Sequence, residues 1–129
     1  MRFFFTFLIL LLGSSMYAQS PDCKKFKTGK FGYPTMPGKI SLRRDDVQES
    51  YNNGKLEMKW KVKWISDCQY ELTCIKMLVD SYPIAVGDRI LSTIVSTDQD
   101  CFTHESVFFN KQNPDGVVMP AAAMCLAKD

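Results

Sequence analysis

The stretch Lys55–Cys74, KLEMKWKVKWISDCQYELTC, decides the fold. In its first half, charged residues alternate with the apolar residues Leu56, Met58, Trp60, Val62 and Trp64. Alternation with a period of two places the two sets on opposite faces of a β-strand, whereas a helix would scatter both sets around its circumference. The pattern therefore predicts an antiparallel strand with one buried face and one solvated face.

The second half of this stretch predicts the partner strand and its register. A two-residue turn would set the apolar side chains of one strand opposite polar side chains of the next. A three-residue loop, Ser66–Cys68, instead gives the pairs Trp64–Tyr70, Val62–Leu72 and Trp60–Cys74. Because a slip of one residue turns every side chain to the other face, the hydrophobic pattern selects the three-residue loop.

Short apolar segments separated by turn residues continue on both sides of this hairpin. Turns or breaks are expected at Met36–Lys39, Asp45-Asp46, Asn53-Gly54, Asp98–Asp100 and Asn113–Gly116, with a longer loop at Val79–Gly87. The other predicted strands are Lys24–Tyr33, Lys39–Arg44, Val47–Asn52, Arg89–Thr97, Cys101–Lys111 and Val117–Met119. Ala121–Ala127 fits either a closing strand or a short helix. The chain is therefore predicted to be an all-β antiparallel meander of about eight strands, as a small barrel or a strongly curved sheet.

The N-terminal residues predict export. Arg2 precedes the segment Phe3–Leu12, which is apolar apart from Thr6, and small residues follow up to Ala18. A basic start, a short apolar core and a small-residue exit are typical of a secretory signal peptide, and the apolar segment is too short for a membrane anchor. We expect residues 1–18 to be a signal peptide and residues 19–129 to be a single β domain that is periplasmic or secreted, with no membrane anchor after cleavage.

The charge balance argues against binding to nucleic acid. The chain has 16 Lys+Arg and 14 Asp+Glu, a net charge of +2. A nearly neutral chain has no strong attraction to nucleic acid or anionic membranes. The lysines of the central strand are interrupted by Glu57, and the aromatic residues lie on the opposite face, so we interpret these lysines as a solvated sheet face.

Five cysteines allow two disulfides and leave at least one thiol unpaired. Our first choice of pair is Cys23 with Cys68, and the second is Cys101 with Cys125. Spacing alone does not determine this connectivity, so other pairings stay open. Cys74 faces the apolar side of its strand and is expected to behave as a small buried hydrophobic residue.

The turn at Asn53-Gly54 suggests a polar group inside the fold. A two-residue type I′ turn sets Glu49 opposite Met58, so that the carboxylate would point into the apolar face and need Arg43 or Arg44 to neutralise it. Such a pair among aromatic residues would make a pocket for a small apolar or amphipathic molecule. The alternatives are a bulge that turns Glu49 outward, or a structural ion pair. The predicted ligand-binding residues are Trp60, Trp64, Tyr70, Glu49 and Arg44.

Catalysis and metal binding have little support in the sequence. His104 is the only histidine, and strand alternation places Cys101 on the opposite face from it. No zinc-ligand spacing, glycine-rich phosphate loop or nucleophile elbow occurs. We expect a histidine in the core or at an edge beside Phe102, and a protein that is not an enzyme and needs no cofactor or metal.

The motif W-x-x-D-C-x-Y-x-L at Trp64–Leu72 resembles that of a family of small exported proteins of Bacteroidetes bacteria. Two weaker similarities accompany it: Cys23-x-x-Phe26-x-x-Gly29-x-Phe31 and the segment that contains Arg44, Gln48 and Glu49. The match covers roughly Cys23–Leu72 well. The resemblance implies a lipocalin-like β fold and supports the pairing of Cys23 with Cys68, but it supplies no activity. Some members carry the name DNA topoisomerase IV, and a nucleic-acid role is therefore our most remote hypothesis.

The leading hypothesis is an exported, non-enzymatic, barrel-like protein that binds a small apolar or amphipathic ligand. The second hypothesis is a structural or protein-interaction module with a filled core, in which a sheet edge or the leftover thiol contacts a partner.

Overall fold

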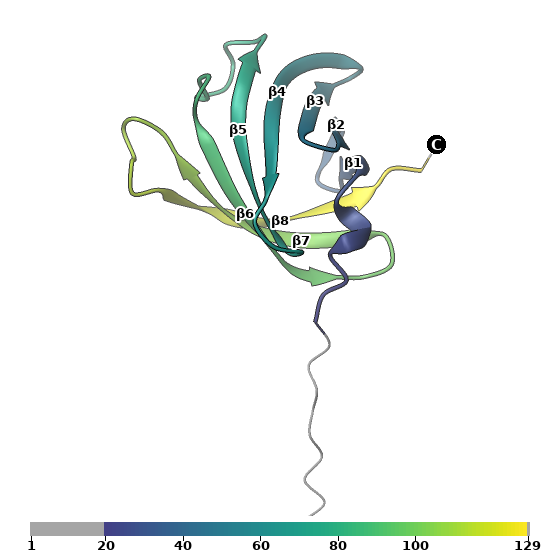
Figure 1. Ribbon diagram of the computed structural model, residues 1–129. Helices are drawn as coiled ribbons and strands as arrows, with labels where there is room; N and C mark the ends of the chain where they lie inside the picture. The colour runs from purple at the N-terminus through teal and green to yellow at the C-terminus, as the bar shows by residue number, and fades with distance from the viewer. Residues whose placement is uncertain (1–19, 129) are drawn as a thin grey trace, which may run out of the picture.

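The computed structural model describes residues 20–128, which form a closed antiparallel barrel of eight strands in sequential order (Figure 1). This confirms the predicted all-β meander and selects the barrel over the curved sheet. The predicted signal peptide, residues 1–18, lies outside the described residues. The elements are η1 (Lys24–Phe26, a 3₁₀ helix), β1 (Gly29–Tyr33), β2 (Met36–Arg44), β3 (Val47–Asn52), β4 (Lys55–Trp64), β5 (Gln69–Met77), β6 (Arg89–Thr97), β7 (Cys101–Phe109) and β8 (Val117–Leu126).

The central hairpin has the predicted register. β4 and β5 pair with Trp64 opposite Tyr70, Val62 opposite Leu72 and Trp60 opposite Cys74. The apolar members of this set other than Trp64 are fully buried, and Trp64 packs against the core as a partly buried side chain. The alternation of β4 therefore supplies much of one wall of the barrel interior.

Several predicted boundaries need correction. Lys24–Phe26 is a 3₁₀ helix rather than strand. Cys23 is fixed by a disulfide and Phe26 is buried in the core, and one helical turn connects the two positions. The first hairpin turns at residues 34–35, between Tyr33 and its partner Met36. Met36–Lys39 is thus part of β2. Gly32 pairs with Ile40 but Tyr33 pairs with Met36, so the three residues between these partners bulge out of the ladder, and Gly38 allows this with a φ of +85°.

The C-terminal segments also differ from prediction. β7 ends at Phe109 instead of Lys111. The segment Ala121–Ala127, left open between strand and helix, is strand up to Leu126 and continuous with Val117–Met119. Pro120 is tolerated inside β8 because only residues 125 and 126 of that strand pair with β1, so its first half is an edge.

Both predicted disulfides are present, and they stabilise the same end of the barrel. Cys23–Cys68 ties η1 to the β4–β5 turn, and Cys101–Cys125 joins directly opposed residues of β7 and β8. Phe26 of η1 is fully buried, with its ring centroid 5.0 Å from that of Phe102. The helix therefore closes this end, which is the lower one in Figure 1.

The free thiol is that of Cys74, which is buried as predicted. Within residues 20–128, no helix is long and apolar enough to cross a membrane.

Candidate functional site

A bulge in β4 reverses the predicted orientation of Glu49. Tyr51 lies opposite Leu56 but Ser50 lies opposite Met58, so Glu57 is an extra residue on β4. Beyond this point Glu49 pairs with Lys59, and Gln48 pairs with Trp60. Gln48, rather than Glu49, therefore faces the interior and is buried there.

Glu49 forms an ion pair on the outer face of the barrel. Its carboxylate accepts a hydrogen bond from Arg44 Nη2 at 2.8 Å and lies 3.7 Å from Lys59 Nζ. The expectation that Glu49 and Arg44 anchor a ligand inside the barrel is therefore wrong in its geometry, and the alternative of a bulge with a structural ion pair is confirmed. Half of the Arg44 side chain or more is in solvent, so this pair contributes little to stability.

The three predicted aromatic residues do lie together in the interior. The rings of Trp64 and Tyr70 are 4.7 Å apart between centroids, and Trp60 is buried four residues before Trp64 on the same strand. Tyr70 and Trp64 contact each other across the β4–β5 pair, as the register requires. The aromatic half of the predicted site is thus present, with a different polar group beside it.

That polar group is Arg43, only 1% exposed. Its guanidinium carbon lies 4.3 Å from the ring centroid of Tyr70, 5.1 Å from that of Phe31 and 5.6 Å from that of Trp64. Arg43 Nε donates to Gln48 Oε1 at 2.8 Å, and Nη1 donates to the carbonyl oxygen of Phe26 at 3.0 Å. These contacts are cation–π interactions and hydrogen bonds to neutral acceptors.

No carboxylate of the described residues lies within ion-pair distance of Arg43. A buried guanidinium keeps its proton, so this part of the barrel carries an uncompensated positive charge. Sequence reasoning considered Arg43 only as a partner for Glu49. Its true neighbour is Gln48, which lies opposite Arg43 in the β2–β3 pair, and the β4 bulge, for which the local pattern gives no signal, places Gln48 opposite Trp60.

His104 lies near Arg43 on the inner face of β7, with its ring 5.7 Å from that of Phe102. Its Nδ1 shares a hydrogen bond with Ser106 Oγ at 3.1 Å, and Ser106 is bonded to Ser92 at 2.8 Å. Burial, and secondarily the positive charge of Arg43, lower the pKa of His104 to about 4. The imidazole is therefore neutral at pH 7, and the expectation of a histidine in the core or at an edge beside Phe102 is confirmed.

Three buried nitrogen atoms of this region have no hydrogen-bond partner among the described residues: Arg43 Nη2, Trp64 Nε1 and His104 Nε2. An unmade hydrogen bond of this kind costs on the order of 1–3 kcal/mol. Their side chains are neighbours, because the Arg43 guanidinium packs on the Trp64 ring and its charge acts on His104. Polar groups that find no protein partner in an aromatic surrounding are typical of a site that accepts a polar group from a ligand or water.

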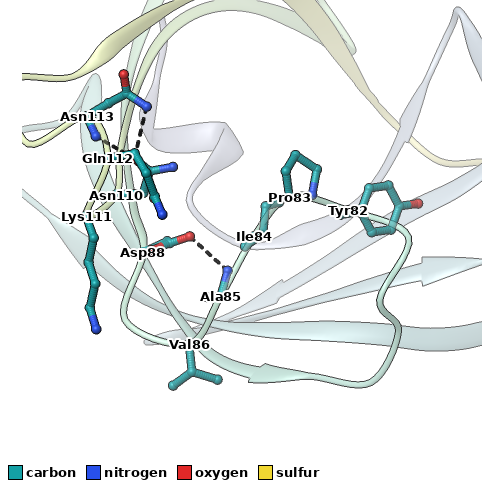
Figure 2. Close-up of a pocket in the computed structure, with 10 residues that line it drawn as sticks. All are labelled: Tyr82, Pro83, Ile84, Ala85, Val86, Asp88, Asn110, Lys111, Gln112 and Asn113. Atoms are coloured by element: carbon teal, nitrogen blue, oxygen red, sulfur yellow. Dashed lines mark hydrogen bonds between the residues drawn. The ribbon is translucent and has the colours of Figure 1, made fainter.

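A second polar cluster holds the long loop at the opposite end of the barrel. Glu57, at the β4 bulge, accepts hydrogen bonds from Lys39 Nζ at 3.0 Å and from Tyr82 Oη at 2.9 Å, and Lys39 also donates to Tyr82. The loop beyond Tyr82 and the turn at Asn110–Asn113 border a surface hollow of about 630 Å³. Figure 2 shows the mixed lining of this hollow, in which Tyr82, Asp88 and Lys111 lie among amide and apolar side chains.

Among residues 20–128, no group of three or more His, Cys, Asp or Glu could hold a metal ion. The fold and the interior define a small β-barrel held by two disulfides, which are typical of an oxidising compartment. No family model, curated protein or solved structure matches this chain.

Proposed function

We propose that the protein is an exported barrel that binds a small amphipathic molecule on its inner face and carries out no covalent chemistry. The observation that carries this proposal is the group of unpartnered nitrogen atoms on Arg43, Trp64 and His104, enclosed by aromatic rings. An interior selected only for stability would leave fewer such donors unmet, because each one is costly.

The exposure of the inner face supports entry from one end. Side chains near η1, such as Phe26 and Phe31, are fully buried. Tyr33 and Ile90 also pack against the core, but they stand toward the other end of the barrel and are only partly buried. The proposal therefore places entry at the end opposite η1, which the 3₁₀ helix does not cover.

A protein-interaction module is the second candidate. It is favoured by the first half of β8, where Val118 is 80% exposed and the residues from 117 to 121 are all exposed and apolar. An exposed apolar edge of this kind suits pairing with another strand. In that case the interior would be a filled core.

Tryptophan fluorescence distinguishes the two. We expect fatty acids or hydrophobic dyes to change the emission of the wild-type protein. The change should persist in Trp60→Phe and be much smaller in Trp64→Phe, because Trp64 carries the unpartnered Nε1 and contacts Arg43. No response to any probe, together with no small molecule bound to protein purified from its own host, would favour the interaction module.

Intact mass spectrometry of the protein from its host tests export in the same preparation. We expect the mass of residues 19–129 with both disulfides formed. A full-length, fully reduced chain would argue against export.

A further inference from the structure

We infer that the bound molecule carries a single carboxylate, which Arg43 Nη2 binds together with Trp64 Nε1 and His104 Nε2. This inference rests on the proposed binding function and names the chemical class of the ligand.

The first argument is charge. Arg43 is buried, and its acceptors are the amide oxygen of Gln48 and a backbone carbonyl, both neutral. Burying a charge without a counter-charge is costly, and contacts with aromatic faces do not neutralise the charge. An anion at Nη2 would neutralise the guanidinium and complete its hydrogen bonds, which a neutral ligand cannot do.

The second argument concerns the number of charges. The other ionisable groups beside this cluster add no further positive charge: Lys27, 5.4 Å from the ring centroid of Trp64, is paired with Asp67, and His104 is neutral. A site with one positive charge matches an anion with one negative charge. A phosphate monoester would bring up to two, so the match favours a carboxylate.

The third argument is hydrogen-bonding capacity. If Ser106 donates to Nδ1 of His104, the neutral imidazole carries its proton on Nε2 and becomes a donor. Arg43 Nη2 and Trp64 Nε1 are donors in every state. A carboxylate is an acceptor with about four lone-pair positions, so it can accept from all three groups. An amine or ammonium head group would face only donors and a like charge.

The surroundings of this donor cluster specify the rest of the ligand. The rings of Phe31, Tyr70 and Trp64 enclose Arg43. Ile90, which is partly buried, lies toward the end of the barrel opposite η1. The ligand class is therefore a carboxylate with an apolar chain that extends toward the end opposite η1.

A matched ligand series tests this inference on the wild-type protein. Dodecanoate, dodecanol and methyl dodecanoate share one chain and differ in the head group, and each can be titrated by displacement of a hydrophobic dye. We expect dodecanoate to bind at least about tenfold more tightly than the other two, because hydrogen bonds to charged groups are worth about 1.5–3 kcal/mol. Acetate alone should not displace the dye.

Variants assign the effect to Arg43. Arg43→Gln should remove the preference for dodecanoate, and Arg43→Lys should keep part of it, whereas the outer-face control Arg44→Gln should change nothing. Circular dichroism of each variant checks that the barrel has formed. Equal affinity of the wild-type protein for all three ligands, or full preference in a folded Arg43→Gln variant, would overturn the inference.

His104 gives an independent readout, because it is the only histidine and its NMR signals are unambiguous. The charged group that acts on this imidazole is Arg43. A carboxylate at Arg43 should raise the pKa of His104 above its value of about 4, and dodecanol should not. A water molecule at Nη2 would give neither effect.

Binding of dodecanol equal to that of dodecanoate would refute the carboxylate and leave the barrel as a binding protein, whereas no binding of any ligand would refute both proposals.

Discussion

Removing the disulfide that anchors η1 should destabilise the protein strongly and open the closed end of the barrel. The perturbation is the double variant Cys23→Ala with Cys68→Ala. The disulfide joins residues 45 positions apart. The chain-entropy relation for a loop of that length gives about 4 kcal/mol of stabilisation, set against a total free energy of unfolding of about 5–15 kcal/mol. The disulfide between Cys101 and Cys125 spans 24 positions and gives about 3.5 kcal/mol by the same relation.

The two double variants differ more in where the structure loosens than in total stability. Without Cys23–Cys68, η1 keeps the packing of Phe26 and its carbonyl bond to Arg43, and the exposed ion pairs of Lys24 and Lys27 with Asp67 add little. The 3₁₀ helix η1 should therefore detach first. Without Cys101–Cys125, the opposed β7 and β8 strands still hold their ladder.

Urea unfolding at equilibrium measures the loss of stability, and tryptophan emission in the absence of urea reports on Trp64 beside Arg43. We expect both double variants to lose about 3–4 kcal/mol, and only the Cys23/Cys68 variant to show altered native emission. A Cys23/Cys68 variant within about 1 kcal/mol of wild type, with unchanged emission, would refute the anchoring role given to η1.

Three further predictions test the interior and the turns. The pKa of His104 is lowered to about 4 in the folded state, so the unfolded state takes up the proton first as the pH falls. Stability should therefore decrease between about pH 6.5 and pH 4 by up to about 3 kcal/mol, and urea titrations of His104→Gln at the same pH values should lack this component. Burial raises the pKa of the Cys74 thiol, so iodoacetamide at pH 8 should leave it unmodified in the native protein and alkylate it in urea. Gly54→Ala should cost about 1 kcal/mol through its φ of +81° alone, since no atom crowds the added Cβ, whereas Gly38→Ala should cost more because its Cβ would collide with Asn53.

The barrel could be predicted because its determinants are local. The alternation around Trp60 and Val62 specifies strand and register within a few residues, and the structure has the same pairs. The turn at Asn53-Gly54 has positive φ at both residues, as its dipeptide indicates. Once these strands pair in order, Cys101 and Cys125 lie directly opposite each other.

The bulge at Glu57 could not be predicted, because its cause is remote in sequence. The Glu57 carboxylate bonds to Lys39 from β2 and to Tyr82 from the long loop, neither of which is near the alternating pattern. Within the pattern itself, Glu57 occupies an outward position, and yet it is buried together with Met58. Tertiary contacts thus override the local period at this one residue.

This one extra residue changes the chemistry of the interior more than it changes the fold. With the regular register, Glu49 and an arginine would both face inward, and the interior would be electrically neutral. With the bulge, Gln48 replaces Glu49 beside Arg43, and the interior keeps one positive charge. A neutral interior would suit an uncharged ligand, whereas a positive one suits an anion. The barrel therefore follows from strand periodicity, but the class of ligand depends on a contact between Glu57, Lys39 and Tyr82 beside the turn that first suggested the site.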